Sequence, residues 1–357
     1  MTICFNSYLK SAARHLSILM LVLITTIAQT GCSTIDDDLS ECGTDYRMDY
    51  EMRLVTNMTT ELQTQLNTVA EANVAKALKK HLGTIFTDVA NDISLSFFDT
   101  EGDSAILHHE AHVINKNQHS YTLYLPKRKY AHVALANIQD NGLVKEVGGE
   151  KCHDFHLEQA KADTIDSHAT GLFTARQDMD VLEGVDQVFD VRLYMANCAN
   201  VFIVDPRGHS TDGMKIYVTG FASSFNPADS TYNYVGKTPI VRPTLIKTEG
   251  SSLLSYCAVT FPSREKGVDT KTIIETEDPF KSAADTKSVW RYIVYVKQPD
   301  GSVTATKLSM MQPIRAGQLK IVKAYIDDDG SLKTSDASVA VSVQLNWNDN
   351  MTEDVDL

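Results

Sequence analysis

Alternation of apolar and polar residues runs through most of the chain and predicts a mainly β protein. In residues 46–55, Tyr, Met and Leu alternate with charged residues, which is the two-residue period of a half-buried strand. Comparable apolar runs, several of them alternating, predict further strands over residues 93–98, 122–125, 132–138, 188–204, 215–221, 255–261, 289–297 and 338–347. Short strands separated by turn signals favour β-sandwiches over a parallel sheet.

One stretch departs from this period and predicts a helix. Between residues 59 and 82, apolar residues recur at helical spacing with charged residues between them. Asp-Gly pairs at 300–301 and 329–330, each between β-forming runs, predict hairpins. The length favours two domains. We expect an N-terminal β-sandwich domain over residues 46–186, carrying the helix as an insertion, and a C-terminal one over 187–357.

The N-terminal residues are typical of an export signal. Lys10 and Arg14 precede an apolar run over residues 18–28, which is shorter than the roughly 20 residues that span a bilayer. Gly31-Cys32 then resembles a bacterial lipobox, although Gln29 stands where that motif usually has Leu. We expect residues 1–31 to be removed and Cys32 to be acylated. The alternative is an ordinary secretory signal with an unmodified Cys32.

The residues after Cys32 are acidic, and so is the whole chain. Residues 32–45 form an acidic tether, which is similar to the export tag of surface lipoproteins in Bacteroidota but is also explained as a solvated linker. The net charge of −13 would become −15 without residues 1–31. Phosphate binding needs clustered Lys and Arg, so this balance argues against nucleic-acid partners. It also argues against adsorption on an anionic membrane, so attachment would come through lipid.

Four cysteines remain in the expected mature chain after Cys32: Cys42, Cys152, Cys198 and Cys257. An oxidising compartment favours disulfides between them, and three pairings are possible. With a domain boundary near residue 186, the simplest pairing is Cys42 with Cys152 and Cys198 with Cys257. The alternative is free, buried thiols, because cysteine packs well as a small hydrophobic residue.

No motif for catalysis or cofactor binding emerges. His108, Glu110 and His112 of "HHEAH" would share a face of a strand, but the zinc-protease pattern needs Glu directly after the first His of a helical pair. "KCHDFH" at 151–156 is equally well explained by surface histidines beside a disulfide. "DDDG" at 327–330 lacks the spacing of a calcium loop. We therefore expect no enzyme, no cofactor and no metal.

Five segments occur in an order that resembles a known family. They are "CSTIDDDLSECG" from Cys32, "YRMDYEMRLV" at 46–55, "DISLSFFDTEGD" at 92–103, "VFDVRLYMANCANVFIV" at 188–204 and "VAVSVQLNW" at 339–347. Together they resemble the FimB-type minor fimbrial anchor subunits of Bacteroidota. The resemblance implies two tandem transthyretin-like β-sandwich domains held to the outer membrane by acyl chains on Cys32. It also implies a basal subunit that anchors a fimbrium, joins a stalk subunit and limits fimbrial length.

Subunits of such fimbriae join by donor-strand exchange, which is a form of β-augmentation. In the polymerising subunits, an arginine-specific protease removes the first strand. In an anchor that cut would sever the lipid, so we expect residues 46–55, with Arg47 and Arg53, to stay uncut as a permanent strand. The candidate donor is the terminal strand 338–347, with Val339, Val341, Val343, Leu345 and Trp347. The alternative is that this strand closes its own sandwich.

Two further expectations follow from the compartment. Ser104, Thr164 and Ser230 each follow Asp in a pattern similar to O-glycosylation sites of Bacteroidota. The rival function is a surface lipoprotein that binds glycan in a polysaccharide-uptake system. Such proteins need an exposed aromatic platform, and the only tryptophans, Trp290 and Trp347, fall in predicted strands.

Overall fold

A computed structural model describes residues 45–55, 63–86, 90–113, 119–139, 141–160, 162, 164–234, 238–265 and 288–347, with the backbone alone at 111–113 and 342–347. Tyr46–Leu357 forms one compact unit, separate from Met1–Asp45. The predicted signal, Cys32 and Cys42 lie outside the described residues. None of the described helices has the length and apolar character needed to cross a membrane.

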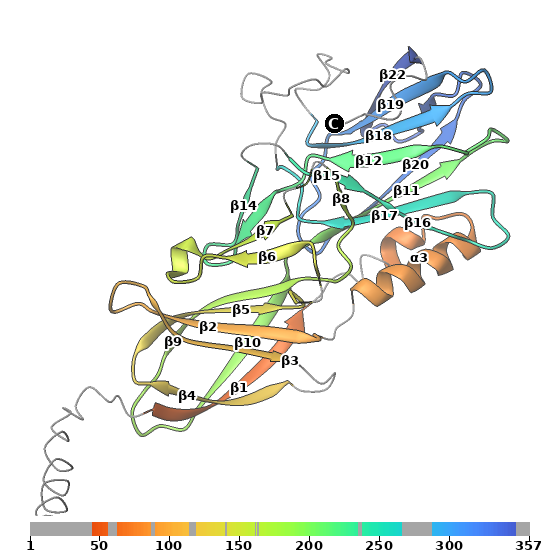
Figure 1. Cartoon of the computed structure of the whole chain (residues 1–357). Helices are drawn as coiled ribbons and strands as arrows, with labels where there is room; N and C mark the ends of the chain where they lie inside the picture. Colours follow the sequence, from red (N-terminus) through yellow and green to blue (C-terminus); the bar gives the residue numbers. More distant parts are fainter. Residues whose placement is uncertain are drawn as a thin grey trace, which may run out of the picture. The chain divides into compact units, whose positions relative to one another are not determined.

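Four sheets make up the described fold, shown in Figure 1. The seven-stranded sheet has the order β3 (Ile106–Val113), β2 (Asp92–Asp99), β5 (Lys129–Ala136), β9 (Phe173–Asp180), β10 (Gln187–Met195), β1 (Asp45–Val55) and β4 (Ser120–Pro126). The four-stranded sheet has the order β14 (Thr231–Asn233), β13 (Ser224–Asn226), β7 (His156–Gln159) and β6 (Val144–Val147). A short 3-10 helix, η1 (Cys152–Asp154), precedes β7.

The other two sheets belong mainly to the C-terminal half. The five-stranded sheet has the order β16 (Thr244–Ile246), β17 (Leu254–Thr260), β11 (Cys198–Asp205), β20 (Leu319–Ile326) and β21 (Leu332–Lys333). The six-stranded sheet has the order β22 (Val339–Trp347), β19 (Val303–Met310), β18 (Trp290–Lys297), β12 (Lys215–Thr219), β15 (Ile240–Arg242) and β8 (Thr164–Asp166). The predicted mainly β fold with several sheets is confirmed.

The seven-stranded sheet curls so that strands distant in its order share one core. Tyr50 of β1 contacts His132 of β5, although β10 and β9 lie between these strands in the sheet. The other face of β2 and β5 packs against the four-stranded sheet, through a cluster that joins Phe98 and Val133 to Phe225. Both faces of β2 and β5 are therefore covered, and for this reason β2 is buried at every position.

A second sandwich forms where the five-stranded and six-stranded sheets face each other. Alternate residues of β11, such as Phe202, enter the core between these sheets, while Val201 and Ile203 point to the opposite face. The rings of Phe202 and Tyr292 stack with centroids 4.6 Å apart. The Tyr292 hydroxyl donates to Asn200 Oδ1 at 2.6 Å, which satisfies a polar group inside this core.

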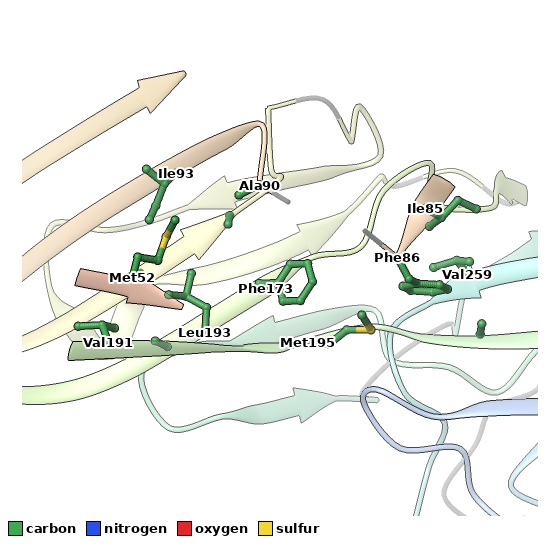
Figure 2. Close-up of a cluster of buried hydrophobic side chains, with 14 of the residues drawn as sticks. Met52, Ile85, Phe86, Ala90, Ile93, Phe173, Val191, Leu193, Met195 and Val259 are labelled. Carbon is green, nitrogen blue, oxygen red and sulfur yellow. The ribbon is translucent and has the colours of Figure 1, made fainter. Parts of the chain in front are cut away.

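Helix α3 (Ala72–Ile85) covers that opposite face of the five-stranded sheet. Its buried residues Val74, Leu78, Leu82 and Ile85 lie on one side and share a cluster with Val201, Val259 and Ile321. Figure 2 shows the same cluster continuing from Phe86 and Val259 to Met52 and Leu193 of the seven-stranded sheet. The helix predicted over residues 59–82 is therefore present. It is interrupted, because the non-helical residues 67–71 separate a short helical segment at 63–66 from α3. It also packs on strands of the C-terminal half.

Strand pairing crosses the predicted domain boundary between residues 186 and 187. β10 begins at that boundary and pairs with β1 and β9, which precede it. Two further strands that precede the boundary pair with strands that follow it: β7 pairs with β13, and β8 pairs with β15. A cut at 186 would separate paired strands of three sheets, so the predicted two-domain division does not coincide with a break in the sheets.

Candidate assembly surface

The first strand, β1, lies inside the seven-stranded sheet. Residues Met48–Val55 pair in parallel with Gln187–Tyr194 of β10. On its other side lies β4, and just before that strand the His119 carbonyl accepts a hydrogen bond from the Met52 amide at 2.7 Å. Met48, Tyr50 and Met52 are buried, as the alternation predicts. The chain that leads from the predicted lipid site thus enters the sheet at an interior strand.

A buried polar pair fixes β1 to the opposite wall of its core. The Tyr50 hydroxyl lies 2.8 Å from His132 Nε2, and His132 Nδ1 lies 3.0 Å from the Ser96 carbonyl oxygen. Because a carbonyl can only accept, Nδ1 carries the proton and Nε2 accepts from Tyr50. Burial lowers the pKa of His132 to about 4, and the Ser96 hydrogen bond opposes that shift only in part. The imidazole is therefore neutral at physiological pH.

The two arginines of β1 point to solvent. Arg53 Nε lies 3.6 Å from Asp190 Oδ1 of β10, and Arg47 lies 3.4 Å from Asp49. Both side chains are about two-thirds exposed, so these ion pairs contribute little to stability. The Arg53 backbone lies within the paired register with β10, whereas Arg47 lies one residue before that register begins.

The terminal strand β22 lies at the edge of the six-stranded sheet. It pairs antiparallel with β19, from Val339 opposite Met310 to Trp347 opposite Val303, with an irregularity near Val303 and Ala305. Val339 is buried in the core of the second sandwich, and Val341 is partly buried against it. The strand thus pairs within its own chain, which is the alternative that the sequence left open.

An Asx turn leads into β22. Asp336 Oδ1 accepts from the Ser338 hydroxyl at 2.6 Å and from the Ser338 amide at 2.9 Å, and Lys320 Nζ lies 3.6 Å from Oδ2. The hydrogen bonds from Ser338, with Lys320 adding to them, hold the pKa of Asp336 below its usual value. The carboxylate stays charged and fixes the direction in which β22 starts.

The structure holds Cys198 and Cys257 as free, buried thiols, so the predicted disulfide between them is wrong. They lie on neighbouring strands, but Cys198 is opposite Thr260 and Cys257 is opposite Val201. Three residues of strand separate them by about 10 Å, too far for a disulfide. They also face different cores. Cys152 is half-buried, and because Cys42 lies outside the described residues, that pairing stays a prediction.

The predicted glycosylation residues occupy different settings. Ser230 is exposed in a turn with φ 57°, and Ser104 is half-exposed in a turn with φ 64°. Thr164 begins β8 and pairs with Ile240. The two turn residues are the more accessible to a modifying enzyme, because their backbone lies outside a sheet. Modification of all three stays a prediction.

Among the described side chains, neither the pair His108 and Glu110 nor Trp290 forms a ligand site. His108 Nε2 lies 2.5 Å from Glu110 Oε1 on β3, and within the described residues no three metal-ligating side chains gather. Trp290 is buried, and its indole donates to the Gln312 carbonyl at 3.0 Å. Trp290 therefore offers no exposed platform for a glycan. The side chain of Trp347 is not among those that the structure describes.

The Tyr50–His132 pair could not be predicted from the sequence. The two residues are 82 positions apart, and only the histidine in the otherwise apolar run "YAHVALA" signals a buried polar contact. Nor did the sequence single out Leu182, Val185 and Val188, which the structure exposes together near the start of β1.

Comparisons with known proteins concern almost the whole described fold. The family model of the fimbrillin-A associated anchor proteins Mfa1 and Mfa2 matches residues 60–348. A putative adhesin from Bacteroides ovatus has a similar structure, with 9% identity, a TM-score of 0.50, and coverage of 86% of this chain and 97% of that one. The fimbrial anchor protein Mfa2 from Porphyromonas gingivalis gives 12% identity, a TM-score of 0.46, and coverage of 85% and 100%. No curated protein matches the chain.

Proposed function

The chain belongs to the family of fimbrillin-A associated anchor proteins, and from this we propose that it is the basal anchor subunit of a cell-surface fimbrium. The family confirms the resemblance drawn from the sequence. In this proposal acyl chains on Cys32 hold the protein in the outer membrane, facing the cell exterior. A stalk subunit joins it by β-strand pairing, and the fimbrium ends at this subunit, which limits its length.

The interior position of β1 is the observation that carries the proposal. An anchor must keep its lipid-bearing segment joined to the folded body while a fimbrium pulls on it. β1 has β10 on one side and β4 on the other, and Tyr50 attaches it to β5 across the core. A protease binds its substrate as an extended strand, and here the edges it would need are already hydrogen-bonded. The lipid-bearing segment would therefore stay attached.

The pairing of β1 also suits it to carry load. Tension on the tether acts along β1 from its N-terminal end. In the parallel pair with β10, eight residues of β1 are in register, so sliding the strand out would break the hydrogen bonds of the pair together rather than one at a time. We expect this arrangement to resist extraction more strongly than an edge strand loaded at right angles.

For the joint with the stalk, β22 is the element best placed. It is an edge strand, so one of its sides can receive a strand from another subunit by β-augmentation. Its release as a donor would expose β19, which is buried along its whole length, and would remove Val339 from the core. We therefore favour a joint in which β22 stays in its own sheet. The alternative is that β22 leaves its sheet and is donated to the stalk subunit, and an experiment has to distinguish the two joints.

Replacement of the lipid cysteine tests the anchor role in cells. With Cys32→Ser, we expect assembled fimbriae to be released into the medium, because the stalk would still join the protein but nothing would hold it to the membrane. Cys152→Ser is the matched control and should leave fimbriae on the cells. Equal numbers of cell-bound fimbriae in both variants, counted by electron microscopy, would contradict the proposal.

A further inference from the structure

Three exposed apolar side chains lie close together in the sequence, two in the connection between β9 and β10 and one at the second position of β10. Leu182, Val185 and Val188 are 44%, 49% and 62% exposed, and we call them the apolar tip. The connection is ordered, because the Leu182 amide donates to Gln187 Oε1 at 2.8 Å and Gln187 Nε2 donates to the Asp180 carbonyl at 2.9 Å. These bonds hold the backbone in place while its apolar side chains remain in water. Single exposed apolar residues are normal, but several together at one point favour a contact.

The apolar tip lies where the chain enters the folded unit. Gln187, the first residue of β10, is opposite Met48 near the beginning of β1. Figure 1 shows the β9–β10 connection beside that beginning. The β4–β5 connection lies there too, since Lys127 Nζ is 3.2 Å from Glu183 Oε2. The segment that leads from Cys32 therefore arrives at the end of the sheet that carries the apolar tip.

The length of chain between Cys32 and Asp45 limits how far this end can be from the lipid. The thirteen Cα–Cα steps from Cys32 to Asp45 span at most about 45 Å when extended, and a Gly/Ser-like random coil of that length spans on average roughly 20 Å. Resting on the proposed lipid anchor, the tether thus keeps the apolar tip close to the membrane. A weak contact there is favoured by the high effective concentration that a tether provides.

Charge near the apolar tip permits such a contact. Residues 126–129 carry three basic side chains, Lys127, Arg128 and Lys129, and residues 180–188 carry three acidic ones, Asp180, Glu183 and Asp186. Lys127 is paired with Glu183, and Arg128 Nη1 lies 2.8 Å from Asp99 Oδ2, so the opposite charges at this end nearly balance in a chain whose net charge is −13. Repulsion from anionic headgroups is therefore weaker here than the overall charge suggests.

We propose that the apolar tip inserts into the interfacial region of the membrane that holds the acylated Cys32, as a second contact beside the acyl chains. Apolar side chains that reach the boundary between headgroups and acyl chains strengthen membrane binding in proportion to the apolar area that they bury. A protein partner fits less well, because stable protein interfaces bury about 800 Å² per partner and three side chains supply only a part of that area. The second contact would fix the orientation of the subunit, with the end that carries β1 against the lipid.

Lipid quenching of a fluorophore tests the proposal. The acylated full-length chain, with Cys42 and Cys152 replaced by serine, would carry an NBD label at Val185→Cys or, as the matched control, at Leu245→Cys. Leu245 is 42% exposed on β16. In vesicles of phosphatidylethanolamine and phosphatidylglycerol with doxyl-labelled lipid, we expect several-fold stronger quenching at 185 than at 245. Adding Leu182→Ser and Val188→Ser should remove the difference.

Flotation of the vesicles separates this proposal from the anchor itself. If the protein floats with the vesicles but both labels are quenched equally, the apolar tip does not touch lipid and the proposal is wrong while the anchor stands. If the label at 185 is shielded only after a stalk subunit or a second copy is added, the apolar tip is a protein interface and the proposal is again wrong. If the acylated chain fails to float, the lipid anchor is wrong and this proposal falls with it.

Discussion

Two buried histidines show how single residues couple this fold to pH. His132 has a partner for each ring nitrogen, whereas both ring nitrogens of His168 are buried with no hydrogen-bond partner. Burial lowers the pKa of His132 to about 4 and that of His168 to about 3. Between pH 6.5 and these values the unfolded chain binds more protons than the folded one, so stability falls as the pH falls.

His168→Leu is expected to raise stability and to weaken its pH dependence. The substitution removes two buried nitrogens that lack a hydrogen-bond partner, and leaving such a group unsatisfied costs about 1–3 kcal/mol of stability. It also places an apolar group of similar size beside Phe261, whose ring the imidazole meets edge-on with the ring centroids 5.5 Å apart. Urea unfolding at pH 7.5 and pH 5 measures both effects. His153→Leu, at an exposed position, is the matched control. Two results would contradict this expectation: a lower free energy of unfolding at both pH values, or the same difference in that free energy between pH 7.5 and pH 5 as in the unsubstituted protein.

The strands differ in how far their roles could be predicted from the sequence. The alternation of β1 predicts both its burial and its place in a sheet, because one face of the strand meets the core. Its neighbours β10 and β4 could not be predicted, since pairing partners far apart in the sequence depend on the whole topology. The helix pattern identified α3 but not the face it covers, because an apolar stripe fits any apolar sheet. For the cysteines, spacing carried no information about the faces on which they lie.

As a paired interior strand, β1 is expected to resist cleavage after Arg53. In limited trypsin digestion of the folded protein, fragments that begin at Leu54 should be much slower to form than fragments that begin at Gly208. Arg207 is exposed in the connection after β11, with φ 49°, whereas Arg53 lies in register with Arg192 of β10. Mass spectrometry over time measures both cuts. Equal rates would mean that β1 is not held as a permanent strand.

For the other end of the chain, a reversible lock distinguishes a strand that stays from one that is donated. Ser309 and Ala340 are opposite each other on β19 and β22, so Ser309→Cys with Ala340→Cys places two thiols where they can form a disulfide. We expect the oxidised and the reduced protein to capture the stalk subunit equally well. The single variant Ser309→Cys controls for oxidation. Capture only after reduction would show that β22 has to leave its sheet.

Across the whole molecule, continuous packing links β1 to the sandwich that β22 borders. One cluster runs from Met52 of β1 through Leu82 of α3 to Val201 of β11, and β11 in turn carries Phe202 into the core that β22 borders. The sequence predicted two separate sandwiches because each half has enough apolar residues for a core. It could not show that a helix from the first half would complete the second. For an anchor, such a shared core transmits tension without a flexible linker between the halves.

Isolation of the native, acylated chain from outer membranes tests the proposed anchor role. The chain would be extracted in mild detergent, captured through an antibody to its own folded part, and separated without heating, with mass spectrometry of every band. We expect a ladder of fimbrial subunits, each member containing one copy of this chain, as for a subunit at the base of a growing fimbrium. Recovery of the chain alone, or with bound polysaccharide and no fimbrial subunit, would contradict the anchor role.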